Sequence, residues 1–91
     1  QWTVEKLART AGMSRAVFAE RFSRTVGMPP LQYLTEWRVA RAKELLLGER
    51  PSMSAVATRV GYGSASAFSA AFTRVVGCSP AEFARQDRQR A

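Results

Sequence analysis

Apolar residues recur at helical spacing near the N-terminus of the chain. Val4 and Leu7 lie on one stripe of a helix that would begin after Thr3, a preferred N-cap residue. Gly12 follows, and glycine is the residue that most often takes the left-handed conformation at the end of a helix. The pattern predicts a short helix that ends near Ala11.

The next segment, SRAVFAERFSRTVG at residues 14–27, has the same organisation. It starts with a serine that can cap a helix and ends with a glycine that can stop one. On a helical wheel, Phe22, Thr25 and Val26 fall within about 80° of Phe18 and are expected to be buried with it. Two helices joined by a short turn that contains glycine form a helix-turn-helix unit.

This unit is duplicated in the second half of the chain. The segment SASAFSAAFTRVVG, residues 64–77, repeats the phenylalanines, the last valine and the glycine of residues 14–27 at the same positions. Ser52 and Gly61 would bound the helix that precedes it. By the same wheel, the buried face of the second copy consists of Phe68, Phe72, Val75 and Val76. The chain therefore contains two helix-turn-helix units.

A longer helix is predicted between the two units. No glycine or further proline interrupts the sequence from Pro30 to Leu47, and Gly48 follows. At about 1.5 Å per residue such a helix is a rod of roughly 27 Å, and Trp37 is expected to lie in the core. After the second unit, a capping-box serine precedes a last short helix through Phe83, and the polar tail beyond it is expected to fray.

These elements define an all-α fold in which two helix-turn-helix subdomains are joined by a long linker helix. We expect the first unit at residues 1–28, the linker helix at 29–48, and the second unit with the C-terminal helix at 49–91. The chain starts with glutamine rather than methionine, and we expect it to be part of a longer protein.

Composition limits the functions that this fold could serve. The chain has 14 lysines and arginines against 7 acidic residues, and its net charge of +7 favours a polyanionic partner, either nucleic acid or an anionic membrane. It contains no histidine, and the sequence has no metal-ligand cluster, glycine-rich phosphate loop or paired carboxylates. We therefore expect that the protein is not an enzyme and that it binds neither a metal ion nor a cofactor.

The single cysteine, Cys78, fits a reducing cytoplasm. No apolar run is long enough to span a membrane.

The side of each repeated helix opposite its phenylalanines is a candidate binding surface. In the first copy this side carries Ala16, Glu20, Ser23 and Arg24, and in the second Ser66, Ala70, Thr73 and Arg74. Small outward residues let a helix backbone approach a large partner closely. The major groove of DNA is wide enough to admit one α-helix in this way.

Together these features resemble the DNA-binding domain of AraC/XylS-type regulators. The resemblance rests on Gly27-x-x-Pro30-x-x-Tyr33, on WRVARAKELL in the linker, and on AVATRVGYGSASAFSAAFTRVVGCSPAEF in the second unit. It implies a sequence-specific bacterial transcription regulator that inserts helices at 14–26 and 64–76 into successive major-groove segments of double-stranded DNA. It also implies a location at the bacterial nucleoid in the cytoplasm, an effector-sensing or dimerisation domain outside this region, and contact with RNA polymerase if the protein is an activator.

The resemblance also assigns base-facing positions, at Ala16, Ala19 and Glu20 in the first unit and at Ser66, Ser69 and Ala70 in the second. Family members often have a basic residue in place of Glu20 and of Ala70, so this chain departs from the family at both. Glu20 could accept a hydrogen bond from cytosine N4, or it could pair with Arg24 one turn further on. Both interpretations stay open at this point.

The two copies are expected to divide the work of DNA binding. Alanine side chains cannot hydrogen-bond, so we expect base reading mainly from the first unit, where Arg15 would contact phosphate or guanine unless it is only a solvated charge. The second unit would hold the DNA backbone through its serines, Thr73, Arg74 and the helix N-terminus. The predicted DNA contacts are Arg15, Ala16, Ala19, Glu20, Ser23, Arg24, Ser64, Ala65, Ser66, Ser69, Ala70, Thr73 and Arg74.

The main alternative is a basic helical module that binds a protein or a membrane. Against it stands the duplicated turn and helix, which a helix facing lipid does not need. Among the other arginines, Arg38 and Arg41 of the linker could face DNA, but we expect them to face solvent or to pair within the protein. Arg21 is expected to pack beside Phe18 or to pair with a carboxylate.

Overall fold

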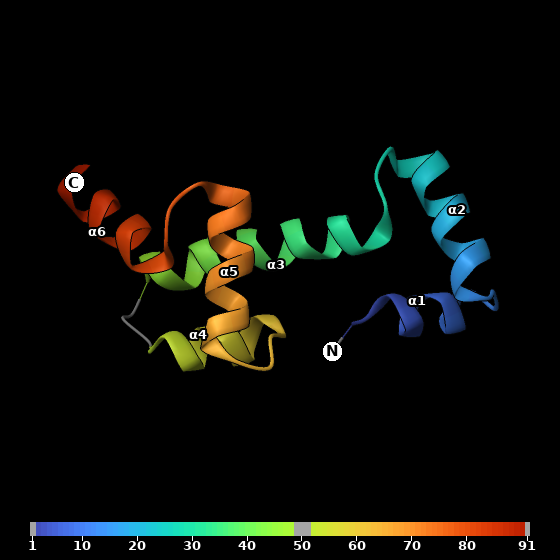
Figure 1. Ribbon diagram of the computed structural model, residues 1–91, viewed down its shortest axis with the longest axis horizontal. Helices are drawn as coiled ribbons and strands as arrows, with labels where there is room; N and C mark the ends of the chain where they lie inside the picture. The colour runs from blue at the N-terminus through green and yellow to red at the C-terminus, as the bar shows by residue number, and fades with distance from the viewer. Residues whose placement is uncertain (1, 49–51, 91) are drawn as a thin grey trace. The chain divides into compact units, whose positions relative to one another are not determined.

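The computed structural model describes residues 2–48 and 52–90, and over these residues helices are the only regular secondary structure. The helices in Figure 1 are α1 (Val4–Thr10), α2 (Arg15–Val26), α3 (Pro30–Leu47), α4 (Met53–Val60), α5 (Ala65–Val76) and α6 (Pro80–Arg90). The all-α fold is confirmed, with helix-turn-helix pairs at α1–α2 and α4–α5 and the long α3 between them in the sequence.

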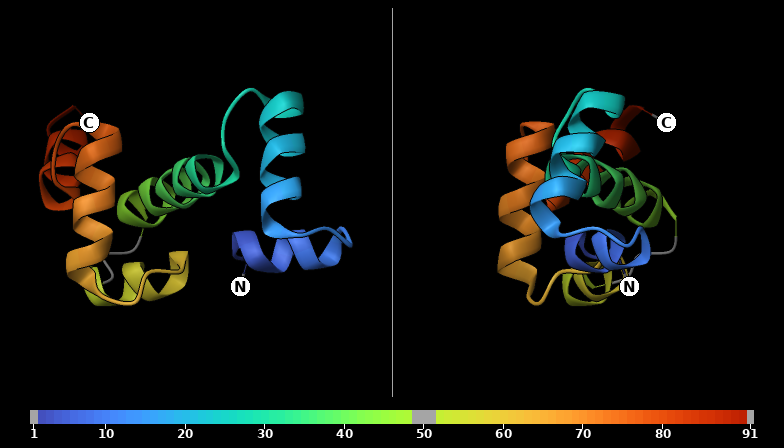
Figure 2. Two further views of the ribbon diagram at one scale, coloured as in Figure 1. Left: turned by 45° about the vertical axis from the view of Figure 1, so that its right-hand side comes forward. Right: turned by 90° about the vertical axis from the view of Figure 1, so that its right-hand side faces the viewer.

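The chain divides into two compact units, Gln1–Trp37 and Arg38–Ala91. The division falls within α3, so each unit contains one part of this helix. The expected domain boundary at residue 49 lies outside the described residues. In both views of Figure 2, α2 meets α1 through a short turn, and α5 meets α4 in the same way.

Side-chain hydroxyl groups set where most of the helices begin. An N–H three residues further on donates to the hydroxyl oxygen of Thr3, Ser14, Ser52 and Ser64 at 3.1 to 3.2 Å. Ser79 accepts in the same way from the N–H of Glu82 at the start of α6. Gly27 and Gly77, which end α2 and α5, have φ values of 92° and 96°, which residues with a Cβ rarely adopt. The predicted starts of these helices and the predicted ends of α2 and α5 are confirmed.

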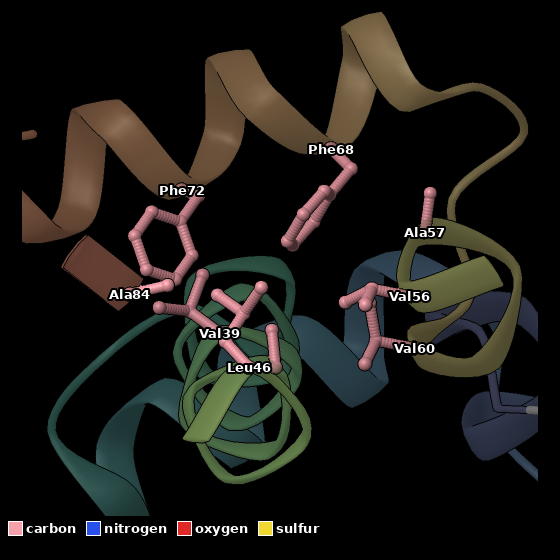
Figure 3. Close-up of a cluster of buried hydrophobic side chains, with 9 residues drawn as sticks. Val39, Leu46, Val56, Ala57, Val60, Phe68, Phe72 and Ala84 are labelled. Carbon is pink, nitrogen blue, oxygen red and sulfur yellow. The ribbon is translucent and has the colours of Figure 1, made fainter. Parts of the chain in front are cut away.

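The second unit has a closely packed core, drawn in Figure 3. Its buried residues are Val39, Ala42 and Leu46 of α3, Val56, Ala57 and Val60 of α4, Phe68 and Phe72 of α5, and Ala84 of α6. Both phenylalanines are completely enclosed, with 0% of their surface exposed. The core therefore fixes α5 through the face that carries its phenylalanines.

The first unit buries much less of its matching helix. Val4, Ala8 and Leu34 are buried, but no residue of α2 is buried. Phe18 and Phe22 are only half-buried, so the prediction of a buried phenylalanine face on α2 is wrong in extent. The reason lies in the neighbours: α2 packs mainly against α1, whereas α5 packs against α4 and also against α6.

Both units nevertheless contain the same series of aromatic contacts. In the first unit the ring of Phe22 lies 5.7 Å from that of Phe18 and 5.4 Å from that of Tyr33, measured between centroids. Phe72 makes the equivalent contacts in the second unit, with Phe68 at 5.7 Å and with Phe83 of α6 at 5.6 Å. The duplication seen in the sequence is therefore a duplication of packing.

Several side chains that were expected to be buried are exposed. They are Thr25 and Val26 at the end of α2, Val75 at the end of α5, and Trp37 in α3. Trp37 exposes 58% of its surface. It lies about 160° around α3 from Val39, so it faces away from the residues of α3 that enter the core. A helical wheel gives the direction of a side chain, but burial also requires another element to cover that direction.

The last helix is longer than predicted. α6 continues to Arg90 instead of ending near Phe83. Ala84 is buried in the core of the second unit and holds the next turn in place. Alanine, arginine and glutamine, which dominate the segment beyond it, are good helix formers. The expected end of the helix near Phe83 is therefore wrong, and residues 84–90 of the expected polar tail are helical.

Candidate nucleic-acid interface

The outward face of α2 carries small and charged side chains. Arg15, Ala16, Glu20 and Arg24 are exposed, and Ala19 and Ser23 are half-buried. The two phenylalanines of α2 face the rest of the first unit. The helical wheel placed Ala16, Glu20, Ser23 and Arg24 opposite them, with Ala19 at the edge, and all five lie at or near the surface. Arg15, in the first turn of α2, lies about 60° around the helix from Phe18.

The outward face of α5 repeats this arrangement with almost no charge. Ser64, Ser66, Ala70, Thr73 and Arg74 are exposed, and Ala65 and Ser69 are half-buried. The exposure of Ala70 matches that of Glu20, and the half-burial of Ser69 matches that of Ala19. Because Phe68 and Phe72 hold the other side of α5 in the core, this face is held toward solvent.

Arg15 and Arg24 of α2 are both paired with carboxylates. Nη2 of Arg24 donates to Oε1 of Glu20 within the helix. Nη1 of Arg15 lies 3.3 Å from Oε1 of Glu5, which belongs to α1. The four side chains expose between 54% and 72% of their surface. Solvent therefore screens both pairs, and exposed pairs of this kind contribute at most about 1 kcal/mol to stability.

Arg74 on α5 has no such partner among the described residues. Ala70 stands one turn before Arg74, where the first copy has Glu20 before Arg24. The two helices therefore present equivalent arginines in different electrostatic surroundings.

The arginines of α3 are engaged within the protein. Nη1 of Arg41 donates to Oε2 of Glu44 at 2.9 Å. The guanidinium of Arg38 lies 5.6 Å from the centre of the Tyr62 ring. Of the two expected alternatives, solvent or a partner within the protein, the structure shows the second. Arg21 of α2 is exposed, and no carboxylate of the described residues forms an ion pair with it.

The hydroxyl groups of Ser64, the N-cap of α5, and of Thr73 differ in whether they can donate a hydrogen bond to an anion. Ser64 accepts a hydrogen bond from the N–H of Ala67, so its own hydroxyl proton is still available for donation. Thr73 instead donates its hydroxyl proton to the carbonyl oxygen of Ser69 at 2.8 Å. A phosphate only accepts hydrogen bonds, so Ser64 is ready to bind one, whereas Thr73 would first have to give up its intrahelical bond.

Sequence reasoning missed one residue of this surface, Glu5. It lies on another helix from Arg15, and only the packing of α1 against α2 brings the two together. A comparison of the two repeats could have indicated that Glu5 and Arg15 form a pair. Ser54 stands in the second copy at the place of Glu5, and Ala65 at the place of Arg15, so both members of the pair are replaced together.

The described residues form neither a metal-ligand cluster nor a membrane-spanning helix. Over residues 2–48 and 52–90, histidine, cysteine and acidic side chains nowhere gather in threes as the ligands of a metal ion would. In the same residues, no helix combines the length and the apolar character needed to cross a membrane.

The chain is similar to known regulators over nearly its whole length. A family model described as a helix-turn-helix domain matches residues 7–86. A protein of Streptomyces antibioticus named as an AraC-like transcription regulator is 49% identical over 83 residues, which cover 90% of this chain and 27% of that protein. The RCS-specific HTH-type transcriptional activator RclR of Escherichia coli K12 is 43% identical over 90 residues, which cover 99% of this chain and 32% of that protein.

A solved structure with a similar fold contains DNA. The crystal structure of the DNA-binding domain of AdpA, in complex with a target DNA, matches with a TM-score of 0.91 and 41% identity, over 99% of this chain and 81% of that chain. This chain spans only 27% and 32% of the two curated relatives described above. The family that they represent consists of regulator domains and is not a class of enzymes. The chain belongs to the AraC-type family of helix-turn-helix DNA-binding domains.

Proposed function

We propose that this chain binds double-stranded DNA sequence-specifically and regulates transcription, with α2 and α5 as its two recognition helices. The observation that carries the proposal is the repeated frame of the two units. Each presents a capped helix after a short turn, with phenylalanines toward its own unit and small residues outward. The structure of AdpA with its target DNA supports the same role here.

In this proposal α2 reads bases. Arg15 contacts phosphate or guanine, and Ala16 and Ala19 allow the helix backbone to come close to the base edges. The carboxylate of Glu20 has two oxygens, and Arg24 engages Oε1. The other oxygen is left to accept a hydrogen bond from cytosine N4. Ser23 and Arg24 complete the contact surface of this helix.

The role of α5 in the proposal is to hold the DNA backbone. Ser64 has a hydroxyl proton to donate, and the first N–H groups of α5 point toward any anion placed at its N-terminus. Arg74 supplies a positive charge that no described carboxylate neutralises. Ser66, Ser69 and Thr73 add polar contacts, while Ala65 and Ala70 allow close approach. This division gives the two units different tasks on one scaffold.

The proposal extends to the longer protein. Residues 1–28 and 49–91 act as the two DNA-binding units, and residues 29–48 connect them so that successive major-groove segments are engaged. An effector-sensing or dimerisation domain lies elsewhere in the protein. Binding takes place at the bacterial nucleoid in the cytoplasm, and an activator would also contact RNA polymerase.

A salt titration tests the proposal directly. The dissociation constant of the 91-residue chain for mixed-sequence duplex DNA is measured across a range of salt concentrations, in parallel with binding to anionic lipid vesicles. Because phosphate contacts release counterions, the logarithm of the association constant, which is the reciprocal of the dissociation constant, should fall linearly with log salt. Binding that does not depend on salt, or a preference for vesicles over duplex DNA, would contradict the proposal and favour a module that binds proteins or membranes.

A further inference from the structure

The ion pair between Arg15 and Glu5 lies at the end of α2 that the proposed function directs toward DNA. Arg15 is the first residue of α2, and Glu5 lies in the first turn of α1. Their side chains approach to 3.3 Å. A negative charge is therefore fixed beside the guanidinium to which the proposed function assigns a phosphate or a guanine.

The fold of the first unit does not depend on this pair. Both side chains are more than half exposed, so solvent screens their attraction. The second unit shows the same frame without the pair, because Ser54 and Ala65 stand at the two positions. It keeps the capped helices and the aromatic contacts. The pair is therefore a special property of the first unit and not a requirement of the helix-turn-helix frame.

We propose that Glu5 competes with DNA for Arg15 and so lowers the affinity of the first unit for any duplex. This inference rests on the proposed function. The guanidinium has several N–H donors, and Glu5 engages one nitrogen of it. When DNA binds, Arg15 either leaves Glu5 or is shared with it. In both cases the carboxylate takes up part of the positive charge that Arg15 would otherwise offer to the phosphates.

The variant Glu5→Gln tests this inference, because it removes the charge and keeps the shape of the side chain. Dissociation constants are measured at low salt for a selected operator duplex and for a random duplex. From the usual strength of exposed ion pairs, we expect binding to both to become tighter by about two- to five-fold. In an Arg15→Ala background the same substitution should have little effect, because Glu5 acts through Arg15. Glu5→Ser, which installs the residue of the second copy, should behave like Glu5→Gln.

Glu44→Gln is the matched control. It removes the same charge from another exposed pair, with Arg41 in α3, and should leave both dissociation constants unchanged. The inference is overturned if Glu5→Gln fails to tighten binding, or if it tightens binding equally in the Arg15→Ala background or no more than Glu44→Gln does. In those cases the proposed function stands. A wild-type chain that shows no salt-dependent binding to duplex DNA would overturn both, and circular dichroism confirms that each variant is folded.

Discussion

Phe22 and Phe72 hold equivalent positions in the two repeats, but Phe72 is fully buried and Phe22 is only half-buried. Each ring packs edge-on against an aromatic residue of the following helix, Tyr33 at 5.4 Å and Phe83 at 5.6 Å between centroids. The contacts are the same, but the second unit has more elements around them. The two units therefore share a framework and differ in how deeply it is packed.

This difference predicts unequal losses of stability. Phe72→Ala should lower the free energy of unfolding by about 3–5 kcal/mol, as is usual for a buried phenylalanine. Phe22→Ala should cost clearly less, because part of the ring is already in water. Denaturant melts followed by circular dichroism measure both. Trp2 and Trp37 lie in the first unit, so their fluorescence reports on the unit that Phe22→Ala affects. Equal losses for the two variants would contradict the difference in packing.

Arg74→Ala should weaken DNA binding without changing sequence preference. A phosphate contact is made to any sequence, so the affinities for operator and random duplexes should fall by similar factors. The slope of the logarithm of the association constant against log salt should become shallower by about 1. Arg41→Ala is the control, since Arg41 is paired with Glu44 in α3. A loss confined to one operator variant would show that Arg74 reads a base.

Glu20→Gln should change preference at one base position. The carboxylate can accept a hydrogen bond from cytosine N4, whereas a glutamine amide suits adenine. We therefore expect the preferred base at that position to move from cytosine toward adenine. A series of operators with single base substitutions measures the relative affinities. If these keep the same order in wild type and variant, Glu20 serves only as the partner of Arg24.

Ala70→Glu should weaken binding through the second unit. The new carboxylate would stand one turn before Arg74, as Glu20 does before Arg24, and would pair with that arginine as well as repel phosphate. Affinity should fall most at low salt, where charges are least screened. Ala70→Gln adds similar bulk without charge and serves as the control. A similar loss in both variants would point to steric exclusion from the groove.

The helix starts and the ends of α2 and α5 could be predicted because they are set by local chemistry. Ser14 caps α2 with its own side chain, and Gly27 ends it with a positive φ. Both events depend on a few neighbouring residues, which a sequence displays directly. The exposure of Val26 and Trp37 could not be predicted in this way. It depends on which elements lie over those side chains, and that is a property of the folded unit.

In the candidate interface too, features set within one helix could be predicted, whereas a contact between helices could not. The helical period alone places Ala16 and Ala70 outward, and both are exposed. The pair of Glu20 with Arg24 also follows from spacing within one helix. The partner of Arg15 did not follow, because Glu5 comes from a different helix and reaches Arg15 only when α1 packs against α2.

The most direct measurement of the central claim is a footprint of the 91-residue chain on an operator selected from random duplexes. Hydroxyl-radical cleavage and guanine-methylation interference together show which groove segments the protein covers. If α2 and α5 enter successive major-groove segments, two protected regions should appear on one face of the duplex, with centres about 10–10.5 base pairs apart. A single protected segment, or two segments on opposite faces, would contradict the claim.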